Sequence, residues 1–378
     1  MRIGIDARLW NQTGVGRYTR NLVRNLLILD KNNTYILFVR KQDYGIINDQ
    51  LLMIKHQNKL KIKNWKLEIA DIKWHSIAEQ IKFPKILEKE NLDLVHFPYF
   101  SLPIFYKKPY VVTIHDLIIN HYPTGKASTL FPLLYYSKLL SYKFIIYQAS
   151  KNAKKIIVPS IATKNEVIDH LKIADEKIVV TPEAADQGLR IKNSELRINK
   201  YGKYFLYVGN AYPHKNLDRL IQAFNVFHDQ RPKTKDLKLI LVGRKDYFYK
   251  RLEQKTKSQN IIFYGVATDA ELSNLYKNSL CLVMPSLMEG FGLPVLEAMA
   301  NKCLVACSDI PSLREVVKDN ALYFNPKNIT EIQEAMSNVY DQKYKKEITE
   351  NAYAAAKEFS FEKMAKETLK IYESCFSI

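Results

Sequence analysis

Short apolar runs rich in β-branched residues recur along the chain and alternate with longer segments of helical periodicity. The first half contains RIGIDA, TYILFV, LDLVHF, YVVTIHD, KIIVPS and KIVVTP, and the second half contains YFLYVGN, LKLILVG, IIFYGV, LCLVMPS, CLVACSD and ALYFNP. Strands that alternate with helices are typical of parallel α/β sheets rather than of sandwiches. The pattern therefore predicts two Rossmann-like, doubly wound domains in tandem.

The length and the polar segments indicate where these domains begin and end. A chain of 378 residues favours two domains, because a domain usually has roughly 100 to 200 residues. The polar segment EAADQGLRIKNSELRINKYGK has no strong periodicity and is the best linker candidate. We predict a first domain over 1–185, a linker over 186–203 and a second domain over 204–355. The amphipathic helix expected over 356–378 has no strand of its own to cover, so we expect it to pack back toward the first domain.

Positive charge is concentrated in the first half of the chain. Residues 1–190 carry 29 Lys and Arg against 17 Asp and Glu, whereas residues 191–378 carry 28 against 22, for a total net charge of +18. Nucleic acid, an anionic membrane surface and a phosphorylated substrate are all partners that fit such a charge. Since no aromatic-basic pattern supports binding of nucleic acid, we expect no nucleic-acid partner.

The chain shows no sign of secretion or of a membrane span. The start, MRIGIDARLW, lacks the apolar region of a secretion signal, and no apolar run approaches the ~20 residues that cross a bilayer. We expect a cytoplasmic protein, with reduced thiols at its four cysteines. The segment 128–155 mixes aromatic, aliphatic and lysine residues at helical spacing. Both a core helix and a helix lying on an anionic membrane fit it, which leaves peripheral contact with the inner membrane open.

The segment EGFGLPVLE combines two carboxylates with two glycines just after an apolar strand. We predict Glu289 in the loop and Glu297 in the first turn of a helix that begins near Pro294. Gly290 and Gly292 let backbone amides approach a ligand, and the helix N-terminus favours an anion such as phosphate. The carboxylates are suited to accepting hydrogen bonds from nearby ribose or sugar hydroxyls, although an acidic residue in a first helical turn is also ordinary helix-dipole chemistry.

The longer string PSLMEGFGLPVLEAMA resembles the signature of GT-B retaining glycosyltransferases of family 4, in which seven residues separate two glutamates. Further matches cover nearly the whole chain. The resemblance implies two Rossmann-like lobes that face each other across a cleft, the first binding the acceptor and the second a nucleotide sugar. It implies that Glu297 binds the nucleotide ribose and that Glu289 contacts hydroxyls of the donor sugar. The donor-binding residues between them are Gly290, Phe291, Gly292 and Leu293.

A second match lies in YFLYVGNAYPHKNLDRL, where Lys215 takes the place of a family lysine that binds the donor diphosphate. A compact ammonium suits that task. The family commonly has an arginine five residues earlier, and here that place is Asn210, so one positive charge is missing. Arg244, at the end of the next strand, is our candidate for replacing it, and His214 is a weaker one. An ordinary surface role for Arg244 stays open.

Two further segments match the family at positions that line the donor. IIFYGVATDAEL resembles the segment beside the nucleotide base, with Gly265 and Val266 close to the ring. In IDARLWNQTGVGRYTR we predict that Gly14 and Gly16 lie in a loop before the first helix. Thr19 stands where a dinucleotide-binding G-x-G-x-x-G motif needs its third glycine, which argues against a dehydrogenase. By resemblance, this loop closes over the donor phosphates and sugar.

The strand YVVTIHDLI places His115 and Asp116 at its carboxyl end. A lone histidine is more often structural, but ligands of parallel sheets bind beyond the strand ends. The resemblance implies that His115 contacts the donor sugar, which makes His115, Glu289 and Lys215 the expected catalytic residues. Asp116 is an expected acceptor-binding residue. Arg17 is another, although a helix-surface role is equally open for it.

The resemblance implies a retaining hexosyltransferase that uses a nucleotide sugar, GDP-mannose being favoured and UDP-sugars next. The expected acceptor is a glycan or lipid-linked glycan in the synthesis of a surface polysaccharide or lipopolysaccharide. The sequence contains no D-x-D triplet and no P-loop, so we expect no metal and no other cofactor. A catalytically silent protein that binds a sugar nucleotide or a glycan on the same fold is the alternative.

Overall fold

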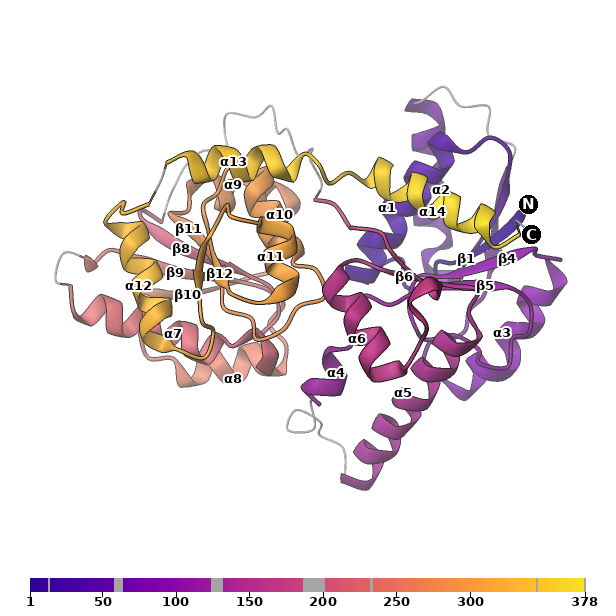
Figure 1. Cartoon of the computed structure of the whole chain (residues 1–378), viewed down its shortest axis with the longest axis horizontal. Coiled ribbons are helices and arrows are strands. Elements are labelled where there is room, and N and C mark those ends of the chain that lie inside the picture. Colours follow the sequence, from indigo (N-terminus) through magenta and orange to yellow (C-terminus); the bar gives the residue numbers. More distant parts are fainter. Residues whose placement is uncertain are drawn as a thin grey trace. The chain divides into compact units, whose positions relative to one another are not determined.

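The computed structural model describes residues 1–12, 14–57, 64–123, 132–185, 201–231, 234–344 and 346–376, without the side chains of residues 132–134. The chain forms two compact units (Figure 1). Unit 1 comprises Met1–Leu117, Phe131–Glu183 and Ser360–Ile378, and unit 2 comprises Ile118–Leu130 and Ala184–Phe359. Most of the predicted linker over 186–203 lies outside the described residues.

Unit 1 is built on a seven-stranded parallel sheet with the order β3-β2-β1-β4-β5-β6-β7. The predicted doubly wound architecture is confirmed, and the strands are β1 (Arg2–Asp6), β2 (Thr34–Val39), β3 (Trp65–Ile69), β4 (Leu94–Phe97), β5 (Tyr110–Thr113), β6 (Lys155–Val158) and β7 (Ile178–Val180). The sequence patterns missed β3, because this edge strand reads WKLEI and is only partly buried.

Helices cover both faces of this sheet, and successive strand residues point to opposite faces. In β2, Tyr35 packs with the core on one side and Ile36 with the core on the other. The helices are α1 (Gly14–Leu29), α2 (Tyr44–Gln57), α3 (Ile77–Lys89), α5 (Pro132–Asn152), α6 (Ile161–Leu171) and α14 (Phe361–Ser374), with short 3-10 turns η1 (Lys41–Asp43) and η3 (Asp175–Lys177).

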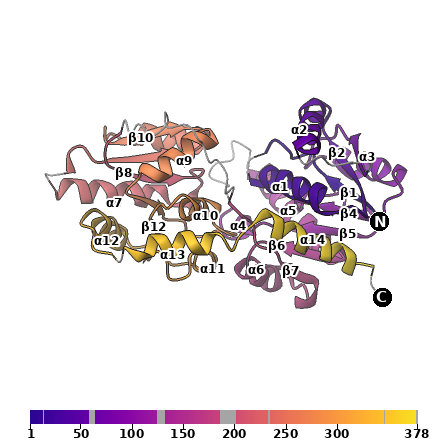
Figure 2. The same ribbon diagram turned by 90° about the horizontal axis from the view of Figure 1, so that it is seen from above.

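The last helix of the chain belongs to unit 1. Met364, Ala365, Ile371 and Tyr372 of α14 are buried in the same core as residues of α1 and β1. Figures 1 and 2 show α14, in yellow, beside the strands of this sheet. The part of the chain that returns to unit 1 begins at Ser360, slightly later than the boundary at residue 356 drawn from the sequence.

Unit 2 repeats the scheme with a six-stranded parallel sheet in the order β10-β9-β8-β11-β12-β13. Its strands are β8 (Tyr204–Val208), β9 (Lys238–Val242), β10 (Ile261–Gly265), β11 (Cys281–Met284), β12 (Val305–Ser308) and β13 (Leu322–Phe324). Its helices are α4 (Ile118–His121), η5 (Pro213–Lys215), α7 (Leu217–Asp229), α8 (Tyr247–Lys255), α9 (Asp269–Asn278), α10 (Leu293–Ala300), α11 (Pro311–Val317), α12 (Ile329–Tyr340) and α13 (Glu347–Ala356).

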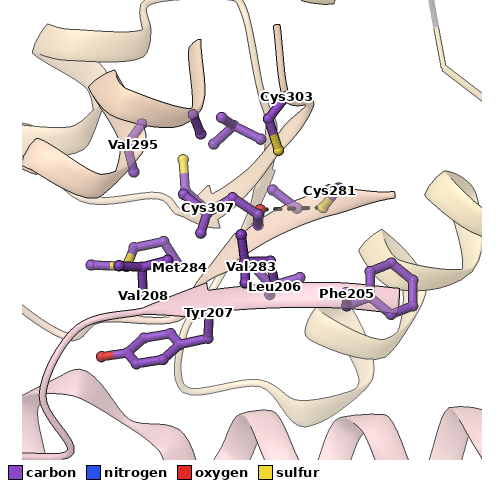
Figure 3. Close-up of a cluster of buried hydrophobic side chains, with 14 of the residues drawn as sticks. Phe205, Leu206, Tyr207, Val208, Cys281, Val283, Met284, Val295, Cys303 and Cys307 are labelled. Atoms are coloured by element: carbon purple, nitrogen blue, oxygen red, sulfur yellow. Dashed lines mark hydrogen bonds between the residues drawn. The ribbon is translucent and has the colours of Figure 1, made fainter. Parts of the chain in front are cut away.

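The central strands of unit 2 are fully apolar, as expected for strands covered on both faces. Figure 3 shows side chains of β8 and β11, Cys281 among them, in one cluster with Val295 of α10 and with Cys303 and Cys307. Cys281, Cys303 and Cys307 are buried, half-buried Cys375 lies in unit 1, and all four are free thiols, as predicted. Among the described helices, none is both long and apolar enough to cross a bilayer.

Candidate functional site

The strand order of unit 2 reverses between β8 and β11, and ligands of doubly wound sheets bind beyond the carboxyl ends of such strands. β8 leads into the short turn η5, and β11 leads into the loop before α10. The two connections are joined, because the amide of Leu287 donates to the carbonyl of His214 at 2.7 Å, and Asn216 Nδ2 donates to the carbonyl of Pro285 at 3.0 Å. The fold thus fixes these two loops against each other.

Two predicted site residues meet at this point. Lys215 Nζ donates to Glu289 Oε1 at 2.6 Å, although 74 positions separate them in the sequence. Their side chains are only 12% and 8% exposed, so the pair is shielded from solvent. An ammonium can bind phosphate oxygens, and a carboxylate can accept hydrogen bonds from hydroxyls. The pair therefore places a cationic and an acceptor group side by side at the strand-order reversal.

Helix α10 begins directly after the Glu289 loop. Gly292 precedes it with φ +107°, a conformation that disfavours a side chain, and no side chain caps the helix. An added Cβ at Gly292 would also lie 2.5 Å from Leu313. Pro294 lies in the first turn, as predicted. The uncapped start of α10 and the preceding glycines suit an anion.

The structure corrects the position of Glu297. The helix starts at Leu293, so Glu297 is its fifth residue and lies beyond the first turn. There its side chain is mostly buried, and Tyr276 of α9 donates its hydroxyl to Glu297 Oε2 at 3.0 Å. Sequence reasoning missed Tyr276, since no local motif marks a residue that acts on a distant helix. Helix-dipole capping no longer explains Glu297, because the dipole effect falls off within the first turn.

Between the two glutamates, the predicted donor-binding residues differ in environment. Phe291 is buried and its ring packs edge-to-face against Phe359, with centroids 5.8 Å apart, so this side chain has a core-packing role. Gly290 is buried and Leu293 half-buried. The structure thus leaves the backbone, rather than the aromatic ring, as the part of Phe291 suited to a ligand.

His214 is a buried polar side chain beside the Lys215–Glu289 pair. It is 5% exposed, and its Nδ1 has no hydrogen-bond partner in the part of the chain that the structure describes. Burial, followed by the charge of Lys215, lowers the pKa of His214 to about 4. The idea that His214 replaces the missing positive charge is therefore wrong, because the ring is neutral near pH 7. The hydroxyl of Ser286, in the neighbouring loop, is also buried without a partner among the described residues.

The other predicted donor residues lie at the same edge of the sheet. Arg244 is exposed just after β9. Burial raises the pKa of Tyr212 above its ordinary value, and the positive charge of Arg244 offsets part of that rise. Asn210 accepts a hydrogen bond from the amide of Tyr212 at 3.2 Å. Gly265 ends β10 with φ +89°, and Val266 follows it with an exposed side chain. The role of Arg244 as the replacement for the missing charge stays a prediction.

In unit 1, His115 lies two residues beyond β5, but both of its ring nitrogens already have partners. Nδ1 is 2.8 Å from Glu183 Oε1, and Nε2 is 2.9 Å from the carbonyl of Pro98. Because a carbonyl only accepts, Nε2 carries a proton. Burial disfavours the charged ring, but the Glu183 carboxylate and the Pro98 carbonyl outweigh it, so the pKa of His115 lies above its ordinary value.

No sequence motif marks Glu183, which is the first carboxylate after the segment KIVVTP. Beside His115, a second buried histidine is equally satisfied. His96 Nδ1 lies 2.6 Å from the hydroxyl of Tyr372, and its Nε2 lies 2.8 Å from that of Thr113. Burial lowers the pKa of His96 to about 3. These bonds tie α14 to the centre of the sheet, which indicates a structural role for His96.

The predicted glycine loop of unit 1 is wrong in part. α1 begins at Gly14, so both Gly14 and Gly16 lie in its first turn. A Cβ at Gly16 would lie 2.4 Å from the carbonyl oxygen of Trp10, whereas a Cβ at Gly14 would meet none of the described residues within 4 Å. Gly16 is therefore needed for close packing. Arg17 and Asp116 are half-buried, and their acceptor-binding roles stay predictions.

Solved structures with the same fold cover nearly the whole chain. A sucrose-phosphate synthase from Thermosynechococcus elongatus matches with a TM-score of 0.76 and 17% identity, over 100% of this chain and 99% of that one. Anabaena Alr3699/HepE, solved with UDP and glucose, matches with a TM-score of 0.71 and 16% identity, over 99% and 100%. These likenesses show the fold, which is GT-B.

Two family models match in tandem. Residues 12–187 match the model described as Glycosyltransferase Family 4, and residues 190–357 match Glycosyl transferases group 1. The chain belongs to the GT-B glycosyltransferases. This glycosyltransferase is also 27% identical over 388 residues to the O-antigen chain mannosyltransferase B of Escherichia coli, and the alignment covers 96% of each protein. The predicted fold and family are confirmed.

Proposed function

We propose that this glycosyltransferase moves a hexosyl group, with retention, from a nucleotide sugar to a glycan or lipid-linked acceptor in polysaccharide biosynthesis. Unit 2 binds the donor in this proposal, and unit 1 binds the acceptor. The observation that carries it is the Lys215–Glu289 pair at the strand-order reversal of unit 2.

The geometry of the pair matches the chemistry of a sugar nucleotide. In such a donor the sugar is bonded directly to the diphosphate, so a phosphate oxygen and the ring hydroxyls lie a few bonds apart. Lys215 Nζ and Glu289 Oε1 are 2.6 Å apart. Lys215 can therefore bind the diphosphate while Glu289 binds the sugar of the same donor. Glu297, oriented by Tyr276, is the proposed acceptor for the ribose hydroxyls.

In the proposed reaction, the bond between the sugar and the diphosphate breaks while the acceptor hydroxyl attacks from the same face. The leaving diphosphate oxygen takes the proton of that hydroxyl, so no enzyme nucleophile is needed. Lys215 and the uncapped start of α10 stabilise the negative charge that develops on the diphosphate. The Lys215 ammonium supports a metal-independent reaction, as does the lack of a D-x-D triplet in the sequence.

GDP-mannose is the favoured donor, and UDP-sugars come next. Support for mannose comes from the similarity to the O-antigen mannosyltransferase over 96% of the chain. Support for a UDP-sugar comes from the fold shared with Alr3699/HepE, which was solved with UDP and glucose. The choice between the two donors therefore rests on the relatives.

Donor turnover tests the proposal. The purified chain is incubated with GDP-mannose, UDP-glucose and UDP-galactose in EDTA, and release of the free nucleotide is measured with and without a mannose-terminated acceptor. We expect one donor to be consumed without added metal, and NMR of the product to show the anomeric configuration of that donor. An inverted product contradicts retention, and activity that needs a divalent cation contradicts metal independence. A donor that binds without any turnover indicates the catalytically silent alternative.

A further inference from the structure

Five side chains with aromatic rings form one contiguous group in unit 1. Trp74 follows β3, Tyr99 and Phe100 follow β4, and Tyr142 belongs to α5. The ring of His75 links them, because its centroid lies 5.9 Å from that of Tyr99 and 5.5 Å from that of Phe100. The Trp74 ring lies 5.5 Å from the His75 ring, and the Tyr142 ring packs edge-to-face on Phe100 at 5.1 Å. We call these five side chains the aromatic cluster.

The aromatic cluster lies near the place where the strand order of the unit 1 sheet reverses. β1 and β4 are neighbours, with β2 and β3 on one side and β5, β6 and β7 on the other. Tyr99 is the second residue beyond β4, and Trp74 is the fifth beyond β3. Ligands of doubly wound sheets bind beyond the carboxyl ends of the strands at such a reversal. The cluster therefore takes the same kind of position in unit 1 that Lys215 and Glu289 take in unit 2.

The aromatic cluster is anchored in the core on one side and accessible on the other. Phe100 is buried in the core of unit 1. Trp74, Tyr99 and Tyr142 are half-buried, and His75 is exposed. Aromatic rings that are packed on one side and open on the other can contact a ligand with little rearrangement.

A buried ionic network fixes the loops that carry the aromatic cluster. Arg8, just after β1, donates to Asp6 at 2.7 Å and to Glu79 at 2.6 Å. Glu79 also accepts from the amide of His75 at 3.0 Å and from the hydroxyl of Ser101 at 2.8 Å. His75 has φ +54°, which is unfavourable for a residue other than glycine, so its contacts hold it there. The connections after β1, β3 and β4 are thus joined, and the site is preorganised.

A carboxylate lies close to the aromatic cluster. Burial raises the pKa of Tyr142 above its ordinary value, and the negative charge of Asp116 raises it further, so the two side chains interact. Asp116 is half-buried beyond β5. A sugar ring has an apolar face of C–H groups, which an aromatic ring can contact, and an edge of hydroxyls, which can donate to a carboxylate. This combination of groups suits a saccharide.

We propose that the aromatic cluster binds a sugar residue of the acceptor glycan, with Trp74 and Tyr99 against the sugar ring and Asp116 accepting from its hydroxyls. The inference rests on the proposed function, from which it takes the binding of a glycan acceptor by unit 1. It makes Trp74 and Tyr99 specificity-determining residues for a saccharide. An anionic group is disfavoured here, because Asp116 would repel it and Arg8 is already paired with two carboxylates.

Binding of trisaccharides in the absence of donor tests the proposal. The full chain is titrated with mannotriose, maltotriose and chitotriose, and binding is followed by saturation transfer difference NMR. We expect at least one of them to bind the wild type. Trp74→Leu and Tyr99→Leu should each bind it at least about tenfold more weakly, because each removes a central contact of the site. The proposal is overturned if no trisaccharide binds, or if both variants bind like the wild type.

Trp65→Leu is the matched control. Trp65 begins β3 at the other edge of the sheet and stacks on Tyr35 with ring centroids 4.5 Å apart. Trp65→Leu is therefore expected to lower the melting temperature and to retain trisaccharide binding, whereas Trp74→Leu should show the opposite pattern. Equal loss of trisaccharide binding in the two variants overturns the proposal. It is also overturned if guanosine or uridine, and no trisaccharide, binds in a way that depends on Trp74.

The failure of this inference is distinguishable from the failure of the proposed function, since trisaccharide binding requires neither donor nor turnover. A chain that binds a trisaccharide through Trp74 but consumes no donor supports the sugar site and overturns the proposed reaction. In transfer assays, Trp74→Leu should raise the KM for the acceptor by the same factor by which it weakens binding. Sugar transfer with an unchanged acceptor KM in this variant supports the reaction and overturns the sugar site.

Discussion

The buried polar groups at the carboxyl edges of the two sheets differ in their hydrogen bonding. At the edge of unit 1, His115 and His96 each have partners on both ring nitrogens. At the edge of unit 2, Lys215 and Glu289 are paired with each other, while His214 Nδ1 and Ser286 Oγ are buried without partners among the described residues.

This difference shows where a ligand is expected. Buried polar groups are normally hydrogen-bonded, because an unmade hydrogen bond costs about 1 to 3 kcal/mol. At the edge of unit 2, the unpaired polar groups lie near the Lys215 ammonium and the uncapped start of α10. Such groups can bind a polar, anionic ligand. At the edge of unit 1 the two histidines are held by protein contacts, and Thr181 Oγ1, just after β7, is a buried atom there that has no partner among the described residues. Unit 2 therefore fits the donor, and His115 fits direct contact with a donor sugar less well than the sequence suggested.

The largest expected effect is that of Lys215→Ala. Removal of the cation should lower kcat by about 10²- to 10³-fold, as the loss of one group that stabilises developing charge typically does. Donor consumption measures it. Lys245→Ala is the matched control, since Lys245 is a more exposed lysine of unit 2 paired with Glu253, and little change is expected. Equal rates in the two variants would show that the edge of unit 2 is not the catalytic one.

Glu297→Gln should weaken binding of the nucleoside diphosphate about tenfold to a hundredfold, because a hydrogen bond to a charged group contributes about 1.5–3 kcal/mol. Tyr276→Phe should have a smaller effect of the same sign, since it removes only the hydroxyl that orients Glu297. Calorimetric dissociation constants distinguish the two. A loss of stability in Glu297→Gln with unchanged affinity would assign this carboxylate to the core rather than to the ribose.

The buried ring of His214 should make the free energy of unfolding of unit 2 decrease in acid. Its pKa is about 4 in the folded chain, below the ordinary 6.5, so the unfolded state takes up a proton first as the pH falls. Its contribution to stability is complete above pH 6.5 and is lost as the pH falls toward 4. At pH 5 the loss is about 2 kcal/mol.

Urea unfolding of unit 2 at pH 7 and pH 5 measures this loss. His214→Gln should show less destabilisation on acidification than the wild type, by about the same amount. His56→Gln, at an exposed histidine of α2, is the control. If the His214 and His56 variants respond to acid alike, the buried ring does not carry the effect.

The smallest expected effect is a difference in stability between alanine variants of the two glycines in the first turn of α1. Gly16→Ala should destabilise unit 1 by about 1–3 kcal/mol, because the new methyl group meets the Trp10 carbonyl. Gly14→Ala should leave the melting temperature unchanged or slightly higher, since its Cβ points into open space. Thermal melting compares them directly. Similar melting temperatures would contradict the packing role of Gly16.

Much of the fold could be predicted from the sequence, because covered parallel strands are continuous apolar runs. β3 was missed, since an edge strand with half-exposed residues such as Trp65 and Lys66 lacks that pattern. Glu297 was expected in the first turn but lies just beyond it, because the left-handed Gly292 starts α10 at Leu293, one residue before the expected start, and local propensity does not reveal this. Residues within one motif were therefore located well, and their helical register less well.

The site could be predicted only where a motif carried it. Lys215 and Glu289 were each recognised in their own segments, and the strand-order reversal brings them together. The pairs His115–Glu183 and Tyr276–Glu297 depend on contacts across 68 and 21 positions, which no local pattern encodes. The segment 128–155 fitted both a core helix and a helix lying on an anionic membrane, and only the tertiary contacts show that Ile146 and Ala149 of α5 lie in the core of unit 1.

The most direct test of the account is a calorimetric titration of GDP and UDP into the wild type, Lys215→Ala and Glu183→Gln. We predict that at least one of these nucleotides binds the wild type. Lys215→Ala should bind it at least about tenfold more weakly, because a charge-assisted contact to the diphosphate is lost. Glu183→Gln should bind it within about twofold of the wild type. Equal affinity in the wild type and Lys215→Ala, with weaker binding in Glu183→Gln, would contradict the assignment of the donor to unit 2.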